Sequence, residues 1–585
     1  MAGSKASKHV VPLLMPRSYM STESNKTGSW RFLRPRYDEK TAPCSTACPA
    51  GEDIARVEML TAQGLFKEAW ETILKENPFP AVCGRVCFHP CEGICNRGEF
   101  DAPVAIHVME RFLAETAVRY DLKPLLERCP AKKEKIAVVG AGPSGLSAAC
   151  FLNRLGYVCD VFEAASEPGG ILRWGIPEYR LPLSALRSEI AQIESEGVRI
   201  MTDKRLPADF IDRAGDSYDA VFIGCGHGRT TMLRIPGEDV DGVEDGLEFL
   251  NRIRSGETPA VDGVSAVIGG GNTAVDVARS IIRLGGKAVI LYRRRRSDMP
   301  AFQEEVEMAL EEGVELKELL APAGIVKDRK GIFITMRPMK VVGEDEGGRG
   351  RVEPARGKTQ QLLVQRVFKA TGAESVDERY NPPDRRRNVL VLENGVLVDR
   401  PKGPAVFFGG DLVNETKSVT HAVASGKAAA IALDTLFRDG FKAVPGRAAS
   451  CAVGNGKALS MEVYLGGERS SRNPHVVRFA EVNTDYFHFA PRITQPRLMR
   501  EERLNTFKEI NLKISATLAI REAERCFNCG VCNRCDNCYL FCPDLAVMRE
   551  QDLTGRHVDY DYCKGCGLCV VECPRNAMTL EEEER

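Results

Sequence analysis

Several features are missing from the sequence, and each absence excludes a class of protein. The 585 residues contain no run approaching 18 apolar residues, so we predict no membrane-spanning helix. The net charge is −1, which gives no reason to expect nucleic acid or an anionic membrane as a partner. The first apolar run is only about five residues long, too short for a secretory signal. We therefore expect residues 1–29 to form a flexible or partner-binding tail.

Cysteine is absent from residues 226–450, although the chain contains 21 cysteines. Flavoproteins that reduce disulfides often carry a C-x2-C pair in their nicotinamide domain, and this chain has none there. The cysteines instead crowd residues 44–95 and 526–573. Their spacing is typical of metal ligands rather than disulfides, which indicates a reducing compartment and predicts a cytoplasmic protein.

The second crowded region contains the pattern C-x2-C-x2-C-x3-C-P twice, which is the spacing of two-cluster bacterial ferredoxins. In that arrangement the fourth cysteine of each run binds the cluster of the other run. We therefore predict two [4Fe–4S] clusters, one held by Cys532, Cys535, Cys538 and Cys573 and the other by Cys563, Cys566, Cys569 and Cys542. Two zinc sites are the alternative, but four thiolates per run, each run followed by proline, favour iron–sulfur clusters.

Two further cysteines, Cys526 and Cys529, precede the first run. We interpret them as spare thiols at a helix end; the other readings are an alternative first ligand of the run or ligands of another group. The stretch 504–526 is expected to form an amphipathic helix that leads into the ferredoxin-like domain.

Residues 135–165 carry a complete dinucleotide-binding fingerprint. A short apolar strand precedes the turn Gly-Ala-Gly-Pro-Ser-Gly, and a helical stretch and a second strand ending in Glu163 follow. Such glycines allow a pyrophosphate to approach the helix N-terminus, and the acid binds a ribose hydroxyl. Within the turn, the predicted cofactor-binding residues are Gly140, Gly142, Pro143, Ser144 and Gly145.

The fingerprint returns in residues 266–300, where glycines and an alanine fill the G-x-G-x-x-A positions. Tyr292 replaces the ribose-binding acid, and four arginines follow it. Because arginine favours a 2′-phosphate and a carboxylate repels one, we predict FAD at the first turn and NADPH, or NADH, at the second. The alternative is that these arginines form a solvated face or bind a protein. The predicted binding residues are Gly269, Gly271, Asn272, Thr273, Ala274, Arg293 and Arg294.

A third segment, residues 402–433, reads as a strand, the turn Gly409-Gly410-Asp411 and a helix that starts near Val419. Gly410 and Asp411 are therefore predicted to lie at the flavin, although Asp411 alone fits a simple helix cap.

Several motifs together resemble the glutamate synthase small subunit: APCSTACPA, CGRVCFHPCEGIC, EPGGILRWGIPEYRLP, GGGNTAVD and YRRRRSDMPA. The resemblance covers roughly residues 30–440. Dihydropyrimidine dehydrogenase and the bifurcating ferredoxin:NADP oxidoreductase share this architecture. The added tail resembles stand-alone members, among them the iron–sulfur flavoprotein that works beside dissimilatory sulfite reductase. Gly170 and Arg173 of the third motif are included among the predicted cofactor-binding residues.

The resemblance also implies iron–sulfur ligands in the N-terminal region. One family cluster uses three cysteines and a Gln or Glu, which correspond here to Cys48, Cys87, Cys91 and Glu110. The second draws on an upstream C-x2-C, replaced here by Arg36 and Glu39, and on positions that match Cys44 and Cys95. Cys83 is a candidate replacement; alternatively, Cys44, Cys83 and Cys95 bind nothing. We expect one N-terminal cluster and leave the second open.

These observations predict an α/β fold: two Rossmann-like FAD/NAD(P)-binding domains, an N-terminal helical iron–sulfur domain and a C-terminal ferredoxin-like domain. The expected boundaries are 30–132 for the helical domain, 133–250 and 366–440 for the FAD domain, 251–365 for the NAD(P)H domain, 441–525 for a linker and 526–585 for the ferredoxin-like domain.

The expected activity is electron transfer between NAD(P)H and a one-electron acceptor protein through FAD and the clusters. The acceptor is expected to be a ferredoxin or an iron–sulfur oxidoreductase complex, and a homodimer is left open. Hydride transfer needs no catalytic side chain. The alternatives are an electron-transfer subunit with little activity alone, in a 2-oxoacid oxidoreductase, sulfite reductase or glutamate synthase system, and a redox sensor with vestigial sites.

Overall fold

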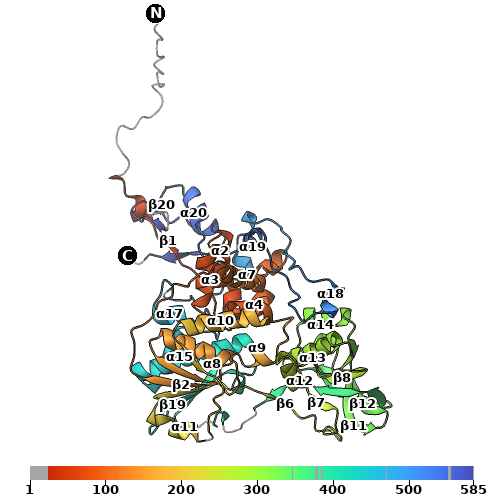
Figure 1. The fold of residues 1–585 in the computed structure, drawn as a ribbon. Helices are drawn as coiled ribbons and strands as arrows, with labels where there is room; N and C mark the ends of the chain where they lie inside the picture. Colours follow the sequence, from red (N-terminus) through yellow and green to blue (C-terminus); the bar gives the residue numbers. More distant parts are fainter. Residues whose placement is uncertain are drawn as a thin grey trace, which may run out of the picture. The chain divides into compact units, whose positions relative to one another are not determined.

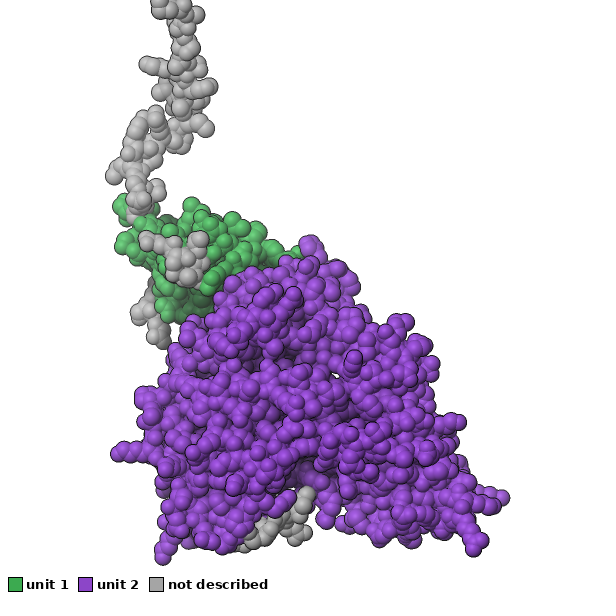
Figure 2. Space-filling view, in the orientation of Figure 1, with its two compact units in different colours: residues 1–39, 480–486, 530–585 green, residues 40–479, 487–529 purple. Residues whose placement is uncertain are grey.

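The computed structural model describes residues 24–207, 209–345, 347–375, 380–383, 387–469, 471–550 and 555–583. The predicted tail therefore lies mostly outside the described residues. The chain divides into two compact units (Figure 2). Unit 1 comprises residues 1–39, 480–486 and 530–585, and unit 2 comprises residues 40–479 and 487–529. None of the described helices has both the length and the apolar character needed to cross a bilayer.

Unit 2 begins with a helical region, shown in red and orange in Figure 1. Its helices are α1 (Pro43–Ala47), α2 (Ile54–Ala62), α3 (Phe66–Leu74), α4 (Pro80–Val86), α5 (Pro90–Gly93), α6 (Arg97–Phe100) and α7 (Ile106–Arg119). Three of them have proline at the first helical position. Proline has no backbone N–H, and this costs nothing there because the first N–H groups of a helix have no partner within the helix. Trp70, Ile73 and Leu113 form the core between α3 and α7.

A segment from the other end of the chain belongs to the same helical region. Helix α19 (Ala516–Ala523) buries Ala519 in the core that contains Trp70. The helix predicted over residues 504–526 is therefore confined to α19, because Ser515 caps its start by accepting a hydrogen bond from Leu518 N at 3.3 Å. The only other helix nearby in the described residues, α18, spans Arg500–Leu504.

The first dinucleotide-binding domain is built on a seven-stranded sheet in the order β17-β18-β19-β5-β2-β3-β4. These strands are β2 (Lys135–Val139), β3 (Val158–Phe162), β4 (Arg199–Met201), β5 (Ala220–Ile223), β17 (Val389–Leu392), β18 (Gly395–Val398) and β19 (Ala405–Phe408). The five strands from β19 to β4 are parallel, and β17 and β18 are antiparallel additions. Helices α8 (Pro143–Arg154) and α15 (Val419–Asp439) pack against each other beside it. Helix α15 begins at the predicted residue.

The second domain contains a five-stranded parallel sheet in the order β10-β9-β8-β15-β7. Its strands are β7 (Val243–Asp245), β8 (Val264–Ile268), β9 (Lys287–Leu291), β10 (Glu315–Lys317) and β15 (Arg366–Lys369). The chain therefore enters this domain before β7 and leaves after β15, so the insertion is longer at both ends than the expected 251–365. Strands β7 and β15 are too short to show an alternation of apolar and polar residues in the sequence.

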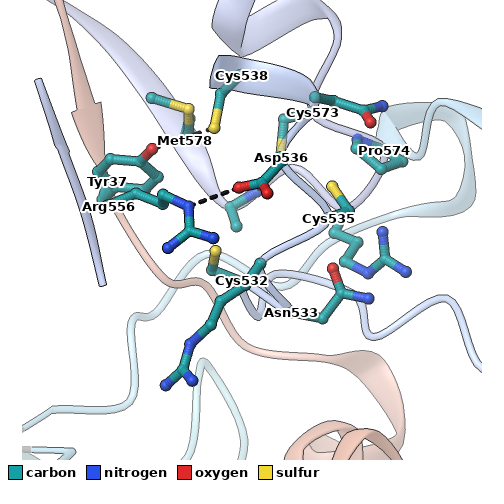
Figure 3. A pocket seen from close by; sticks show the side chains of 14 residues that line it. Tyr37, Cys532, Asn533, Cys535, Asp536, Cys538, Arg556, Cys573, Pro574 and Met578 are labelled. Atoms are coloured by element: carbon teal, nitrogen blue, oxygen red, sulfur yellow. Dashed lines mark hydrogen bonds and ion pairs between the residues drawn. The ribbon is translucent and has the colours of Figure 1, made fainter. Parts of the chain in front are cut away.

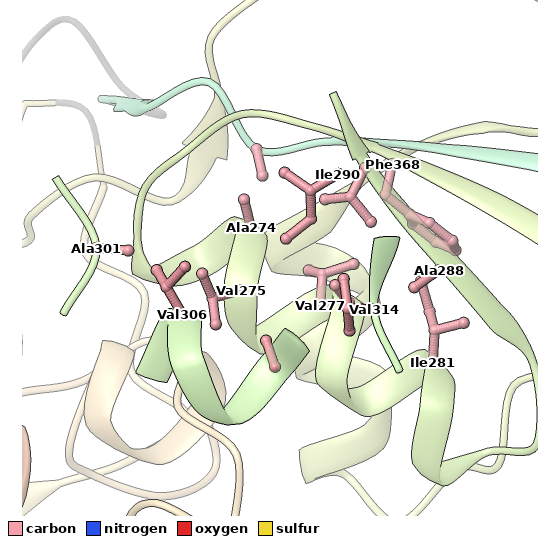
Figure 4. Packing of buried hydrophobic residues seen from close by; sticks show 14 of the residues in the cluster. Ala274, Val275, Val277, Ile281, Ala288, Ile290, Ala301, Val306, Val314 and Phe368 are labelled. Carbon is pink, nitrogen blue, oxygen red and sulfur yellow. The ribbon is translucent and has the colours of Figure 1, made fainter. Parts of the chain in front are cut away.

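Helices α12 (Gly246–Arg254), α13 (Asn272–Arg283) and α14 (Gln303–Glu311) accompany this second sheet. Figure 4 shows the core where α13 meets the strands: Val277 and Ile281 pack with Ile290 and Phe368. An antiparallel sheet of β11 (Leu320–Asp328), β12 (Gly331–Glu344), β13 (Gly350–Pro354) and β14 (Gln360–Val364) completes the domain.

Unit 1 contains the two ferredoxin runs and pairs a segment near the N-terminus with one near the C-terminus. Strand β1 (Leu33–Tyr37) pairs antiparallel with β22 (Met578–Glu582), and β20 (Val547–Arg549) pairs with β21 (Arg556–Val558). Short helices α20 (Asn537–Leu540) and α21 (Leu568–Val571) follow the cysteine loops. Residues 33–37, expected in the helical domain, thus form an edge of the ferredoxin-like unit.

Candidate functional site

A cavity of about 380 Å³ lies in unit 2 and receives residues from both glycine-rich turns. The first turn and the strand after it supply Gly140, Gly142, Pro143, Ser144 and Glu163, and the second turn supplies Asn272 and Thr273. Gly170, Gly410 and Asp411 also line the cavity. The structure therefore brings ten of the predicted cofactor-binding residues to one place.

Two polar side chains in this cavity suit a bound ligand. Ser144 Oγ and Asp276 Oδ1 are buried and have no hydrogen-bond partner within the protein. The Glu163 carboxylate is fixed at the end of β3, where it accepts hydrogen bonds from Ala141 N and Ala165 N, each at 2.8 Å. Burial raises the pKa of Asp411, and His227 and Lys417 oppose that shift. A glycine turn, an orphaned serine at a helix N-terminus and a strand-end carboxylate fit the pyrophosphate and ribose of FAD.

Other predicted residues support the turns from behind the cavity wall. A Cβ on Gly145 would lie 1.9 Å from Gly140 O, and a Cβ on Gly269 would lie 2.1 Å from Ala370 O. Ala274 is fully buried against the second sheet, and Gly271 caps α13. Arg173 does not line the cavity, because it binds Glu167 Oε1 at 2.8 Å and Arg254 O at 2.9 Å.

The arginine run after β9 also lies outside the cavity lining. Arg293 is exposed, whereas Arg294 pairs with Asp345 at 3.1 Å. The next two arginines pair with Asp298 at 2.9 Å and with Glu307 at 3.8 Å. Most of this positive charge is therefore engaged in ion pairs, and the assignment of a 2′-phosphate site to it stays a prediction.

The two ferredoxin runs form two small cavities in unit 1. One is lined by Cys532, Cys535, Cys538 and Cys573 (Figure 3), and its twin by Cys542, Cys563, Cys566 and Cys569. Each cavity thus takes three cysteines from one run and the fourth from the other, as the spacing predicts. Tyr37 from β1 lies 3.1 Å from Cys538 Sγ.

A third cysteine cavity lies in the helical region of unit 2. It gathers the predicted Cys48, Cys87, Cys91 and Glu110. Cys87 Sγ accepts hydrogen bonds from Thr420 Oγ1 at 2.9 Å and from His89 N at 3.3 Å. Burial, followed by the charge of Glu52, raises the pKa of Glu110 well above its usual range. N–H and O–H donors to sulfur are the contacts that an iron–sulfur cluster needs around its ligands.

The spacing of these cysteines bears on the choice between a cluster and a single metal ion. Four sulfurs around one zinc ion, at Zn–S of about 2.3 Å, lie roughly 3.8 Å apart. Among the described residues, only His89, Glu92 and His107 bring three ligand atoms within 4.8 Å of one another. Glu92 also pairs with Arg492, whose charge competes with a metal ion there. Among the described residues, no three cysteine sulfurs meet this 4.8 Å limit, which favours a cubane over a single zinc ion at these sites.

The dinucleotide cavity and the helical-region cysteine cavity share a wall. Val86 and Phe88 line the dinucleotide cavity, while Cys87 between them lines the cysteine cavity. On the opposite segment, Val419 lines the first cavity and Thr420 lines the second. A predicted cluster ligand and the donor to its sulfur therefore lie directly beside the dinucleotide cavity.

Some residues of these sites were not predicted from the sequence, and one was expected elsewhere. Glu52 lines the cavity that contains Cys87, and Thr420 reaches it from α15. Cys83, considered above only for the second N-terminal cluster, also lines this cavity. Cys225 lines the dinucleotide cavity. No motif marked Glu52 or Thr420, whereas the pattern C-x3-C-x3-C beginning at Cys83 was a usable signal.

Comparison with known families agrees with this geometry. Residues 134–426 match the family described as pyridine nucleotide-disulphide oxidoreductase, and the chain belongs to this family. Residues 36–122 match the 4Fe-4S cluster domain II of dihydropyrimidine dehydrogenase, and residues 556–579 match a 4Fe-4S binding domain. The predicted fold class is confirmed. The chain is an NAD(P)H-dependent oxidoreductase that carries FAD and iron–sulfur clusters.

Three relatives illustrate the range of this architecture. The NADP(+)-dependent formate dehydrogenase subunit beta of Moorella thermoacetica is 35% identical over 68% of this chain and 60% of its own length. The NADPH-Fe(3+) oxidoreductase subunit beta of Geobacter sulfurreducens is 31% identical over 84% of this chain and 75% of its own. The glutamate synthase [NADPH] small chain of Halomonas elongata is 31% identical over 66% of this chain and 86% of its own, in agreement with the predicted resemblance.

Proposed function

We propose that the protein oxidises NADPH and delivers the electrons one at a time to an acceptor protein. The first iron–sulfur cluster to receive electrons from the flavin is held by Cys48, Cys87, Cys91 and Glu110. FAD, when bound, accepts a hydride from a reduced nicotinamide and releases single electrons. The remaining task of the chain is to hold the two sites close together and to keep water out of the region between them.

The observation that carries this proposal is the shared wall at Cys87. Val86 and Phe88, the residues directly before and after Cys87, line the dinucleotide cavity, while Cys87 itself lines the cysteine cavity. The Cys87 side chain is buried and Thr420 orients its sulfur by donating a hydrogen bond. A buried and oriented ligand at the edge of a flavin site supports electron transfer from the flavin to an iron–sulfur cluster rather than to a disulfide pair.

The twin cysteine groups of unit 1 support a protein as the acceptor. Cys535 and Cys566 are exposed, so clusters held there are accessible to a partner surface. We propose a ferredoxin or an iron–sulfur oxidoreductase complex as that partner. The clustered thiols further support a reducing compartment, such as the cytoplasm, as the working environment.

The test is anaerobic reduction of a one-electron dye by the isolated holoprotein with NADPH or NADH. Rapid turnover with NADPH, and a slower rate with NADH, is the expected result. Loss of the preference in Arg293→Ala would assign the 2′-phosphate to that exposed arginine. Equal rates with both nucleotides in the native protein would contradict the NADPH assignment.

A second candidate is an electron-transfer subunit with little activity alone. The Moorella and Geobacter relatives are each named as a beta subunit, which supports this candidate. Dye reduction separates the two: an isolated chain that takes up electrons from NADPH in a single turnover but does not turn over would favour the subunit.

A further inference from the structure

Four cysteines outside the three cysteine cavities described above lie together in unit 2. They are Cys44 on α1, Cys95 after α5, and Cys526 and Cys529 after α19. Burial raises the pKa of Cys44 well above its usual range, and the charges of Cys95, Cys526 and Cys529 each raise it further. Asn96 Nδ2 lies 3.3 Å from Cys529 Sγ, which ties the neighbour of Cys95 to the second C-x2-C cysteine.

The loop that carries Cys526 and Cys529 repeats the backbone of the two ferredoxin loops. The residue before the second cysteine has a positive φ in all three loops: 49° at Asn528, 63° at Arg534 and 70° at Gly565. The residue after that cysteine does so as well: 75° at Gly530, 67° at Asp536 and 78° at Gly567. Non-glycine residues rarely adopt this conformation, so its recurrence indicates a common purpose.

The loop of Cys526 also carries a hydrogen bond to sulfur. Asn528 N donates to Cys526 Sγ at 3.3 Å. A turn that points backbone N–H groups at a thiolate is the local structure expected of a cluster-binding loop.

Side chains of the helical region hold this loop in place. Asn528 Nδ2 donates to Ala55 O at 2.9 Å, and Arg97 donates to Arg525 O at 2.9 Å. Glu522, within α19, accepts hydrogen bonds from Ala105 N at 2.8 Å and from Ile493 N at 2.9 Å. The C-terminal cysteine pair is therefore anchored on the same scaffold that carries Cys44 and Cys95.

The N-terminal positions that the resembling family fills with cysteine are used differently here. Arg36 lies in β1 of unit 1 and pairs with Glu581 at 3.2 Å. Glu39 Oε1 accepts a hydrogen bond from Cys532 N at 3.4 Å. The segment that carries Arg36 and Glu39 therefore contacts the ferredoxin-like unit to which it belongs. The C-x2-C pair Cys526 and Cys529, from the far end of the chain, lies beside Cys44 and Cys95 instead.

We propose that Cys44, Cys95, Cys526 and Cys529 hold an additional [4Fe–4S] cluster, so that Cys526 and Cys529 are ligands rather than spare thiols. This cluster would lie next to the Cys87 group, because Cys44 and Cys48 are both on α1 or its cap, with Cys48 N bonded to Cys44 O at 3.1 Å. Cys91 and Cys95 make a second four-residue link between the two groups. The inference concerns metal content and stands apart from the proposed acceptor and nucleotide.

The test counts iron and acid-labile sulfide in anaerobically purified, full-length holoprotein. Four cubanes give about 16 iron atoms per chain, and three give about 12. The double variant C526S/C529S is expected to lose about four iron atoms, and C44S/C95S about the same four. The control is C451S, which changes another buried cysteine whose sulfur lies near Ser450. Its iron content is expected to match that of the native protein.

The outcomes separate clearly. Combining the two double variants should remove no more iron than either alone, since both delete one cluster. A C526S/C529S variant that keeps the native iron content, whether the native count is about 16 or about 12 atoms, would overturn the proposal. So would one equivalent of zinc at this site. If this double variant fails to fold, as judged by lost FAD absorbance, the iron content of C44S/C95S relative to the native protein still decides.

Discussion

Replacing Thr420 by valine should lower the reduction potential of the cluster next to the dinucleotide cavity. Valine keeps the shape of threonine but removes the O–H that donates to Cys87 Sγ at 2.9 Å. That bond stabilises the more negative, reduced cluster more than the oxidised one, so its loss disfavours reduction.

The magnitude follows from the strength of such bonds. A hydrogen bond to a charged group contributes about 1.5–3 kcal/mol, and it is present in both redox states, so only the difference counts. A differential of ~1 kcal/mol corresponds to a shift of ~40 mV for a one-electron couple. The Thr420→Val variant should therefore titrate a few tens of millivolts below the native protein.

The assay is an anaerobic redox titration followed by electron paramagnetic resonance. Thr435→Val is a matched control: Thr435 is also buried on α15, but its hydroxyl donates to Ile431 O at 2.7 Å and not to a cysteine. Equal potentials in the two variants would refute the assignment of Cys87 as a cluster ligand.

The two glycine turns and the buried Glu189 carboxyl can be tested through cofactor binding and pH. A Cβ on Gly142 would meet no atom closer than 4.0 Å, and one on Gly271 would meet none within 4 Å. Gly142→Val should therefore fold but lose bound flavin, whereas Gly271→Val should keep its flavin and raise the KM for NADPH at least tenfold; the reverse pattern would contradict the assignment of the two turns. Burial raises the pKa of Glu189 to about 8, although its carboxylate accepts hydrogen bonds from Ala81 N and Val82 N at the start of α4. Because the folded pKa exceeds the unfolded value, this group's contribution to stability falls as pH rises toward 8, by at most ~1.4 kcal/mol per pH unit. Glu189→Gln should show a smaller drop in unfolding temperature between pH 6 and pH 8 than the native protein, and an equal drop would refute this.

Local patterns predicted the parts of the structure that depend on nearby residues. The spacing of the ferredoxin runs predicted which cysteines meet, because each loop is short and its fourth ligand follows a fixed rule. The glycine turns likewise predicted strands β2 and β8 and the helices after them, since strand, turn and helix are consecutive in the chain.

Long-range pairings were not predictable in the same way. Nothing near Cys44 indicates that Cys526 lies beside it, and nothing in residues 33–37 indicates that they pair with β22. The ends of the inserted domain were also placed too far inward, because β7 and β15 are too short to show a period. In each case the information lies in packing between distant segments rather than in local sequence.

In the proposed function, electrons from the nicotinamide reach iron and sulfur through the site at Cys87. The most direct measurement adds NADPH to anaerobic holoprotein and counts reduced-cluster spins, with dithionite as the full-reduction standard. We expect NADPH to reduce clusters in the native protein, and we expect Cys87→Ser, with its flavin retained, to lose most of this signal. Clusters that dithionite reduces but NADPH leaves oxidised in the native protein would contradict it.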